Sequence, residues 1–292
     1  MSGFQRPMDF GGSWYPAEPR ACRRAIESYW KDAADTGAST PGVGLPPEAR
    51  LGIAPHAGWV YSGALAARTF RALSDDPGVA LVVVLGGHLR ASDPIVATTE
   101  GTWDTPFGAF ALHGGFDARL ARLEPHWERD GRYVADNSTE LQLPFAKLKY
   151  PAAALLALRV PPSARAVALG AALADYFETA GVSAVVVAST DLTHYGPHYD
   201  FTPKGRGPQA LAWVRAENDP AFIAAVEQGE PERLLAVTQQ RRCACSGGAV
   251  ATVAEIARSR GERFRTLGYG TSADRAGADK ENFVGYLAGV WG

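Results

Sequence analysis

Three short stretches of the chain are almost continuously apolar, at residues 51–55, 81–87 and 184–190. Apolar runs without alternation are typical of strands covered on both faces, as in mostly parallel α/β sheets. Further strands are expected at 94–98, 153–160, 263–269 and 283–290, and helices at 19–33, 62–73, 138–150, 163–180, 209–225 and 247–260. The order predicts a three-layer α/β fold with a central, mostly parallel sheet.

Residues that break helices or form loops refine this prediction. Pro144 indicates a break inside the helix expected at 138–150. Residues 35–47 are rich in Gly, Ser and Pro, and we expect a surface loop there. No linker divides the chain cleanly, so we expect one domain over residues 1–292.

Histidines and a carboxylate follow the three apolar runs. His56 ends the first run, His88 ends the second, and the third leads into Asp191 and then His194. In an open α/β sheet the ends of neighbouring strands face one crevice, where ligands bind. The sequence therefore predicts that these side chains converge on one site.

Each of these residues also has a plain structural interpretation. His56 and His88 stand beside glycines, in turns where an imidazole can bond to backbone or lie exposed. Asp191 can cap a helix and leave His194 at the surface. His198, in the same loop, is a weaker candidate. The set is more specific than any one member.

Two cysteines stand just before the helix expected at 247–260. A helix N-terminus favours the thiolate of Cys243 or Cys245, the form that binds a metal, although free cysteine is often simply buried. Two or three imidazoles, a thiolate and carboxylates predict a metal centre. Imidazole suits iron, copper and zinc, while thiolate shifts the preference toward softer ions.

Composition narrows the class of protein. Twenty-nine Lys and Arg balance 31 Asp and Glu for a net charge of −2. No basic run suggests nucleic-acid binding, and no apolar run approaches the ~20 residues of a membrane span. Without a secretory signal near Met1, and with three cysteines too few for a disulfide framework, we expect a cytoplasmic protein.

Aromatic residues lie close in sequence to the histidine-bearing turns. Trp14, Tyr15 and Tyr61 can form the wall of a pocket near His56, although aromatic side chains more often pack in a core.

Several segments, in this order, resemble the Memo family, whose bacterial and archaeal members are called AmmeMemoRadiSam system protein B. The matching segments are Gly12-Ser13-Trp14-Tyr15-Pro16, residues 54–63, Leu85-Gly86-Gly87-His88, residues 140–145, residues 189–196, Cys245 before a helix, and Val284-Gly285-Tyr286. The resemblance covers nearly the whole chain.

The resemblance implies a fold like that of class III extradiol dioxygenases, non-haem iron enzymes that open catechol rings. It also implies that His56, His88 and a cysteine form the metal site, with Asp191 and His194 beside it. The ring-cleaving relatives carry a glutamate where the Memo family has cysteine. Memo-type proteins are associated with iron or copper, and the system name suggests companion proteins.

Three departures from the family pattern mark this chain. The usual Gly-Pro-Ser/Asn-His is shortened to Gly87-His88, the usual Glu-His-Ser becomes Asp-Asn-Ser with Asn137 in place of the histidine, and Cys-Gly becomes Cys245-Ser. Cys245 takes the ligand role because Ala249-Val250 then falls where the family has Pro-Ile. Cys243 remains open.

These expectations define one leading hypothesis and its rivals. The leading one is a mononuclear iron(II) or copper centre on His56, His88 and Cys245, with His194 as general acid/base oriented or assisted by Asp191, acting on a small, catecholic substrate. The rivals are copper or iron redox chemistry without ring opening, a non-catalytic module that holds a peptide or protein in the same crevice, and, less favoured, a zinc hydrolase.

Overall fold

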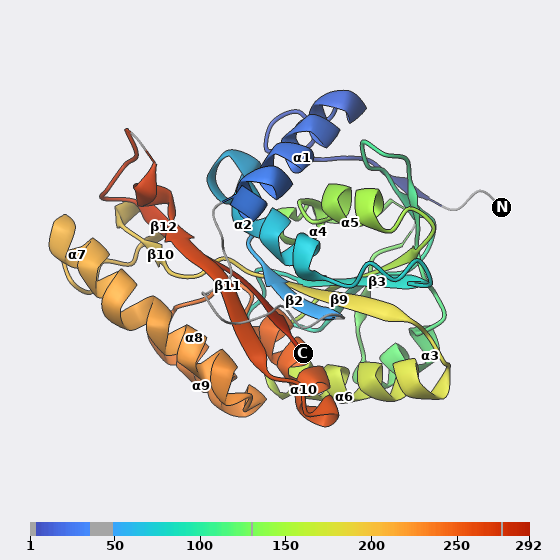
Figure 1. Cartoon of the computed structure of the whole chain (residues 1–292). Coiled ribbons are helices and arrows are strands. Elements are labelled where there is room, and N and C mark those ends of the chain that lie inside the picture. The colour runs from blue at the N-terminus through green and yellow to red at the C-terminus, as the bar shows by residue number, and fades with distance from the viewer. Residues whose placement is uncertain (1–3, 36–48, 130, 276) are drawn as a thin grey trace.

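A mixed sheet with helices on both faces forms the centre of the fold (Figure 1). The computed structural model describes residues 4–35, 49–129, 131–275 and 277–292. Within these ranges the sheet order is β10-β12-β2-β9-β3-β8-β4-β7, with β11 also paired to β12. The strands are β2 (Leu51–Ala54), β3 (Leu81–Gly86), β4 (Val96–Thr98), β7 (His126–Trp127), β8 (Ala154–Arg159), β9 (Ala184–Ser189), β10 (His194–Tyr195), β11 (Phe264–Thr271) and β12 (Phe283–Trp291).

The parallel part of the sheet is its middle. β2, β9, β3 and β8 run parallel, whereas β12 joins β2 and β4 joins β8 in the antiparallel sense. The expected mostly parallel sheet is therefore correct for the centre and wrong for the flanks. A small separate sheet combines β1 (Gln5–Arg6), β5 (Thr102–Trp103) and β6 (Phe110–Ala111).

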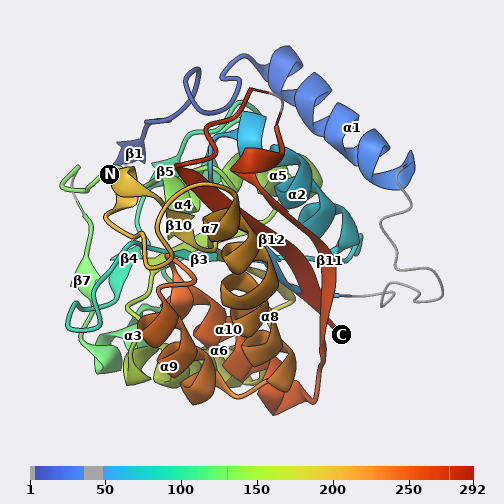
Figure 2. The same cartoon turned by 90° about the vertical axis from the view of Figure 1, so that its left-hand side faces the viewer.

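Helices cover both faces, as the unbroken apolar runs predicted. They are α1 (Pro19–Asp35), α2 (Trp59–Ala72), α3 (Asp117–Leu120), α4 (Asn137–Glu140), α5 (Leu143–Lys149), α6 (Ala164–Thr179), α7 (Pro208–Trp213), α8 (Asp219–Gln228), α9 (Pro231–Arg241) and α10 (Gly247–Arg260). Figure 2 shows α1 and α2 above the sheet and α6, α9 and α10 below it.

Successive residues of β3 serve opposite layers. Val83 packs in the core formed with α6 and α10, while Val82 and Val84 pack in the core formed with α1, α2 and α5. Both cores need apolar side chains, because side chains alternate between the faces of a strand. This requirement explains why the run shows no alternation of polar and apolar residues.

Several expected elements differ from the structure. The helix expected at 209–225 consists of α7, a π-helical turn at Val214–Asn218 and α8. Helix α9 was missed, although Pro231 at its start and Glu232 in its first turn are helix-start signals. The break expected near Pro144 is present, since α4 ends at Glu140 and α5 begins at Leu143. The expected loop at 35–47 lies almost wholly outside the described residues.

Candidate metal centre

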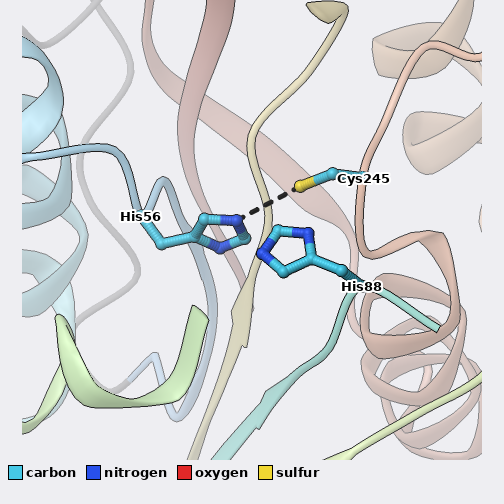
Figure 3. Close-up of side chains that lie close together, drawn as sticks. All are labelled: His56, His88 and Cys245. Atoms are coloured by element: carbon cyan, nitrogen blue, oxygen red, sulfur yellow. Dashed lines mark hydrogen bonds between the residues drawn. The ribbon is translucent and has the colours of Figure 1, made fainter. Parts of the chain in front are cut away.

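The ends of three adjacent parallel strands bring the predicted residues together. β9 lies between β2 and β3, so His56, Asp191 and His88 follow neighbouring strands at one edge of the sheet. The loop before α10 brings Cys245 to the same edge. Figure 3 shows His56, His88 and Cys245 pointing toward one another from three separate segments.

The spacing of these three side chains fits one metal ion. Cys245 Sγ lies 3.2 Å from His56 Nε2, and one ligand atom from each residue lies within 4.8 Å of the others. Metal–sulfur and metal–nitrogen bonds of about 2.3 and 2.0 Å place such atoms about 3.0–3.5 Å apart at angles of 90–110°. The three residues therefore form a candidate metal site.

The structure also separates the two cysteines. Cys243 is fully buried, and its Sγ contacts the Val237 carbonyl at 3.7 Å. Burial raises the pKa of Cys243 to about 12, which keeps it a neutral thiol. Cys245, not Cys243, belongs to the candidate site.

Electrostatics favour a thiolate at Cys245. Burial opposes its ionisation, but the charge and hydrogen bonds of His56 and His88 outweigh burial and hold the pKa of Cys245 well below that of a free thiol. Burial likewise lowers the pKa of His56, yet Cys245 and Asp191 overcome this and raise it to about 9. His88 shifts in the same direction for similar reasons. Without a metal, the site is an ion pair of thiolate and imidazolium.

Backbone contacts tie the Cys245 sulfur to the end of β9. The Asp191 amide donates to Cys245 Sγ at 3.2 Å, and the Cys245 amide donates to the Asp191 carbonyl at 3.1 Å. The Thr190 hydroxyl lies 3.7 Å from the same sulfur. These contacts hold the sulfur without filling the space toward the histidines.

His56 is fixed by buried polar groups on its other side. Its Nδ1 lies 3.1 Å from Ser189 Oγ, and its amide donates to Asp191 Oδ1 at 2.7 Å. Gln142 Nε2 donates to both Ser189 Oγ and the Pro55 carbonyl at 2.9 Å. This leaves His56 Nε2 facing the site. Sequence reasoning missed Gln142, although it stands in a segment that matches the family pattern.

His88 is positioned by the turn before it and by α4. Gly87 adopts φ +107°, which an L side chain rarely adopts, and its amide donates to Ser138 Oγ at 2.7 Å. His88 Nε2 lies 3.1 Å from Asn137 Oδ1, and Asn137 Nδ2 donates to the His56 carbonyl at 3.1 Å. Asn137 thus contacts both histidine-bearing loops.

His194 reaches the site with a defined tautomer. Its Nδ1 lies 3.2 Å from the Leu192 carbonyl, which can only accept, so Nδ1 carries a hydrogen and neutral His194 has its lone pair at Nε2. The ring packs edge-on against Tyr199 at 5.0 Å. The orienting bond that we expected from Asp191 comes from the Leu192 carbonyl instead, and Asp191 Oδ1 accepts from the His56 amide.

A pocket of about 590 Å³ opens above these residues. Its lining includes His56, His88, Asn137, Asp191, His194, Trp14, Tyr61, Tyr199 and Tyr286. Trp14 and Tyr61 are exposed by 41% and 54% at its mouth. Tyr15 lies outside the lining, because it packs on Trp59 and its hydroxyl donates to Glu140 at 2.9 Å. Tyr199 and Tyr286 were not anticipated.

Comparison with known proteins identifies the family. The family described as Memo-like protein matches residues 6–290. The chain belongs to the Memo family. A MEMO1 family protein of Methanopyrus kandleri is 30% identical and aligns over 98% of this chain and 99% of its own length. A MEMO1 family protein of Sulfolobus acidocaldarius is 29% identical over 95% of both chains.

Solved structures support the fold alone. The crystal structure of an uncharacterised Escherichia coli protein matches with a TM-score of 0.50 at 14% identity, covering 77% of this chain and 89% of that one. In the part of the chain that the structure describes, no helix has the length and apolar character needed to cross a membrane.

Proposed function

We propose that this Memo family protein holds one iron(II) or copper ion on His56, His88 and Cys245 and oxidises a small, catecholic substrate in the pocket above. The observation that carries the proposal is the cluster of two imidazoles and a thiolate, whose two histidines line a pocket that also contains His194. We also propose that the protein is cytoplasmic, where reducing conditions would keep the Cys245 thiol available.

The donor set supports these metals over harder ions. Imidazole suits iron, copper and zinc, thiolate favours copper(I) and zinc, and hard oxygen donors are what magnesium and calcium require. Two histidines with one anionic ligand correspond in composition to the set that non-haem iron(II) oxygenases use. When bound, the ion would supply the Lewis acidity and redox chemistry that dioxygen activation requires.

The chain's own residues provide the remaining functions. His194 Nε2 would accept the proton of a substrate hydroxyl, because Nδ1 already donates to Leu192. Trp14 and Tyr61 offer aromatic surfaces at the mouth of the pocket, where a planar ring can stack. The sequence resemblance suggests a relationship to class III extradiol dioxygenases, and we propose it as part of this function. The proposed reaction rests on the site residues, because fold alone does not determine function.

Oxygen uptake tests the proposed reaction. Protein reconstituted anaerobically with iron(II) or copper would be mixed with 4-methylcatechol and dioxygen, and ring-opened product measured by absorbance. We expect metal-dependent turnover that consumes one dioxygen per catechol. Copper-dependent oxygen uptake without ring opening would instead favour copper redox chemistry, and an anaerobic copper titration of wild type against Cys245→Ser would then test thiolate ligation. Absence of turnover with both iron(II) and copper refutes the oxidation of catechols.

A non-catalytic binding module is the alternative, favoured by the exposed apolar side chains at the mouth. Val60 and Tyr61 are exposed by 58% and 54% beside Trp14, and clustered exposed apolar surface often marks an interaction site. This alternative assigns the crevice to a peptide or to a companion protein of the AmmeMemoRadiSam system. It predicts equal partner binding by metal-free and metal-loaded protein.

A further inference from the structure

We infer that Asn137 determines which nitrogen of His88 binds the ion, so that His56 coordinates through Nε2 and His88 through Nδ1. This inference rests on the proposed metal centre. It assigns Asn137 as a positioning residue, a role that neither the family assignment nor the presence of three ligand residues implies.

The hydrogen-bonding capacity of Asn137 fixes its orientation. The His56 carbonyl can only accept a hydrogen bond, so the Asn137 group that lies 3.1 Å from it must be the NH₂. The carboxamide oxygen then faces His88 Nε2 at 3.1 Å. An amide oxygen can only accept, so His88 Nε2 must carry a hydrogen, and the lone pair of neutral His88 lies on Nδ1.

The positions of the two rings agree with this assignment. In Figure 3 the His88 nitrogen that faces the Cys245 sulfur is Nδ1, the one bonded to the ring carbon that joins Cβ. His56 instead faces the sulfur with its distal Nε2, at 3.2 Å. The ring centroids are 5.0 Å apart and the planes lie at 88°. The two histidines thus offer different nitrogens to the same space.

The helix that carries Asn137 is anchored at both ends. At its start, Ser138 Oγ accepts from the Gly87 amide at 2.7 Å, which ties α4 to the turn before His88. At its end, the buried Glu140 carboxylate accepts from the amides of Asp9 and Phe10 and from the Tyr15 hydroxyl at 2.8–3.0 Å. A fixed α4 keeps the carboxamide between the two histidine loops.

The chemistry of an amide suits this role. Its donor and acceptor do not change over the physiological pH range, whereas a histidine, which the sequence pattern of the family has at this position, can change both. Partners that orient metal-bound histidines commonly contribute 10–100-fold to metal affinity. In this chain, the residue at 137 orients a ligand and does not transfer a proton.

Nuclear magnetic resonance of the intact chain tests the assignment directly. The protein would be labelled with ¹⁵N-histidine and loaded with zinc(II), a closed-shell probe, and long-range ¹H–¹⁵N correlations would identify the coordinated nitrogen of each ring. We expect Nε2 coordination for His56, and Nδ1 coordination with a protonated Nε2 for His88. Coordination of His88 through Nε2 overturns the inference and leaves the metal centre intact. Failure to bind zinc(II), iron(II) or copper overturns both.

Two substitutions separate the two bonds of Asn137. Asn137→Ala removes both and is expected to weaken zinc binding about 10–100-fold, with loss of exclusive Nδ1 coordination of His88 in the zinc-loaded spectrum. Asn137→Asp keeps an acceptor for His88 and loses the donor to His56, so the Nδ1 signature of His88 persists. Gln239→Ala removes an exposed carboxamide that donates to the Pro162 carbonyl, and Gln239 belongs neither to the three ligand residues nor to the pocket lining, so neither measurement should change. Unchanged zinc affinity together with unchanged Nδ1 coordination of His88 in Asn137→Ala overturns the inference.

Discussion

Metal affinity should rise steeply with pH, because binding must displace a proton from His56. The pKa of His56 is raised to about 9, after the Cys245 and Asp191 charges overcome the opposing effect of burial. A raised pKa means that the proton is held throughout the neutral range and is lost only as pH approaches 9. The ion needs the lone pair of His56 Nε2, so the metal affinity falls as the pH is lowered below 9. Cys245, with its lowered pKa, is already ionised and adds no pH dependence.

The size of this effect follows from the pKa. At pH 7, His56 is two units below its pKa, which corresponds to about 2.7 kcal/mol or ~100-fold in affinity relative to the fully deprotonated site. The slope is about one log unit per pH unit, and steeper wherever His88, whose pKa is also raised, still holds its proton.

Competition with a coloured zinc chelator between pH 6 and about 8.5 measures the slope, and calorimetry in two buffers counts the protons released. Cys245→Ser is the control. It removes the larger of the two charges that raise the His56 pKa, so that pKa should fall and the slope near neutral pH should flatten, at lower overall affinity. A pH-independent affinity in the wild type, or an equal slope in Cys245→Ser, would refute the ion-pair description of the metal-free site.

Three further substitutions test other parts of the structure. His194→Ala should retain metal, measured by mass spectrometry, and lose 10²–10⁴-fold in catechol turnover; full turnover would remove His194 as the base. Gly87→Ala forces a side chain into a backbone with φ +107° and should weaken zinc binding by displacing His88, whereas wild-type affinity would show that this turn does not place the ligand. Glu128→Ala leaves the buried Arg6 without its carboxylate partner, while Arg159 keeps Asp136 at 3.8 Å, and should lower the free energy of unfolding by about 3–5 kcal/mol. Urea titrations should show a loss of less than about 1 kcal/mol for the exposed Glu27→Ala, and equal losses would contradict the buried network.

The sequence was most informative where backbone geometry determines position. Continuous apolar runs predicted strands covered on both faces, and parallel neighbours necessarily end at one edge. The convergence of His56, His88 and Asp191 follows from these two facts. Cys245 reaches the same edge through a loop before α10, and only the resemblance to the family favoured it over Cys243.

The limits of sequence reasoning lie in the partners of each side chain. Asp191 was expected to orient His194, but it bonds to the His56 amide, which no spacing in the sequence encodes. Gln142 and Asn137 support the two histidines from segments more than 45 residues away in the chain. Tyr15 and Trp14 are adjacent aromatic residues, yet Tyr15 is buried and Trp14 is exposed. Such choices depend on tertiary packing rather than on local pattern.

The metal content of protein purified without added metal tests the central claim most directly. Inductively coupled plasma mass spectrometry would compare the wild type, the His56→Ala/His88→Ala variant and a control, His113→Ala/His126→Ala, whose histidines lie outside the candidate site. The account predicts near-stoichiometric iron or copper in the wild type and in the control, and its loss from the His56/His88 variant. No metal in the wild type even after anaerobic reconstitution, or equal metal in all three proteins, would contradict it.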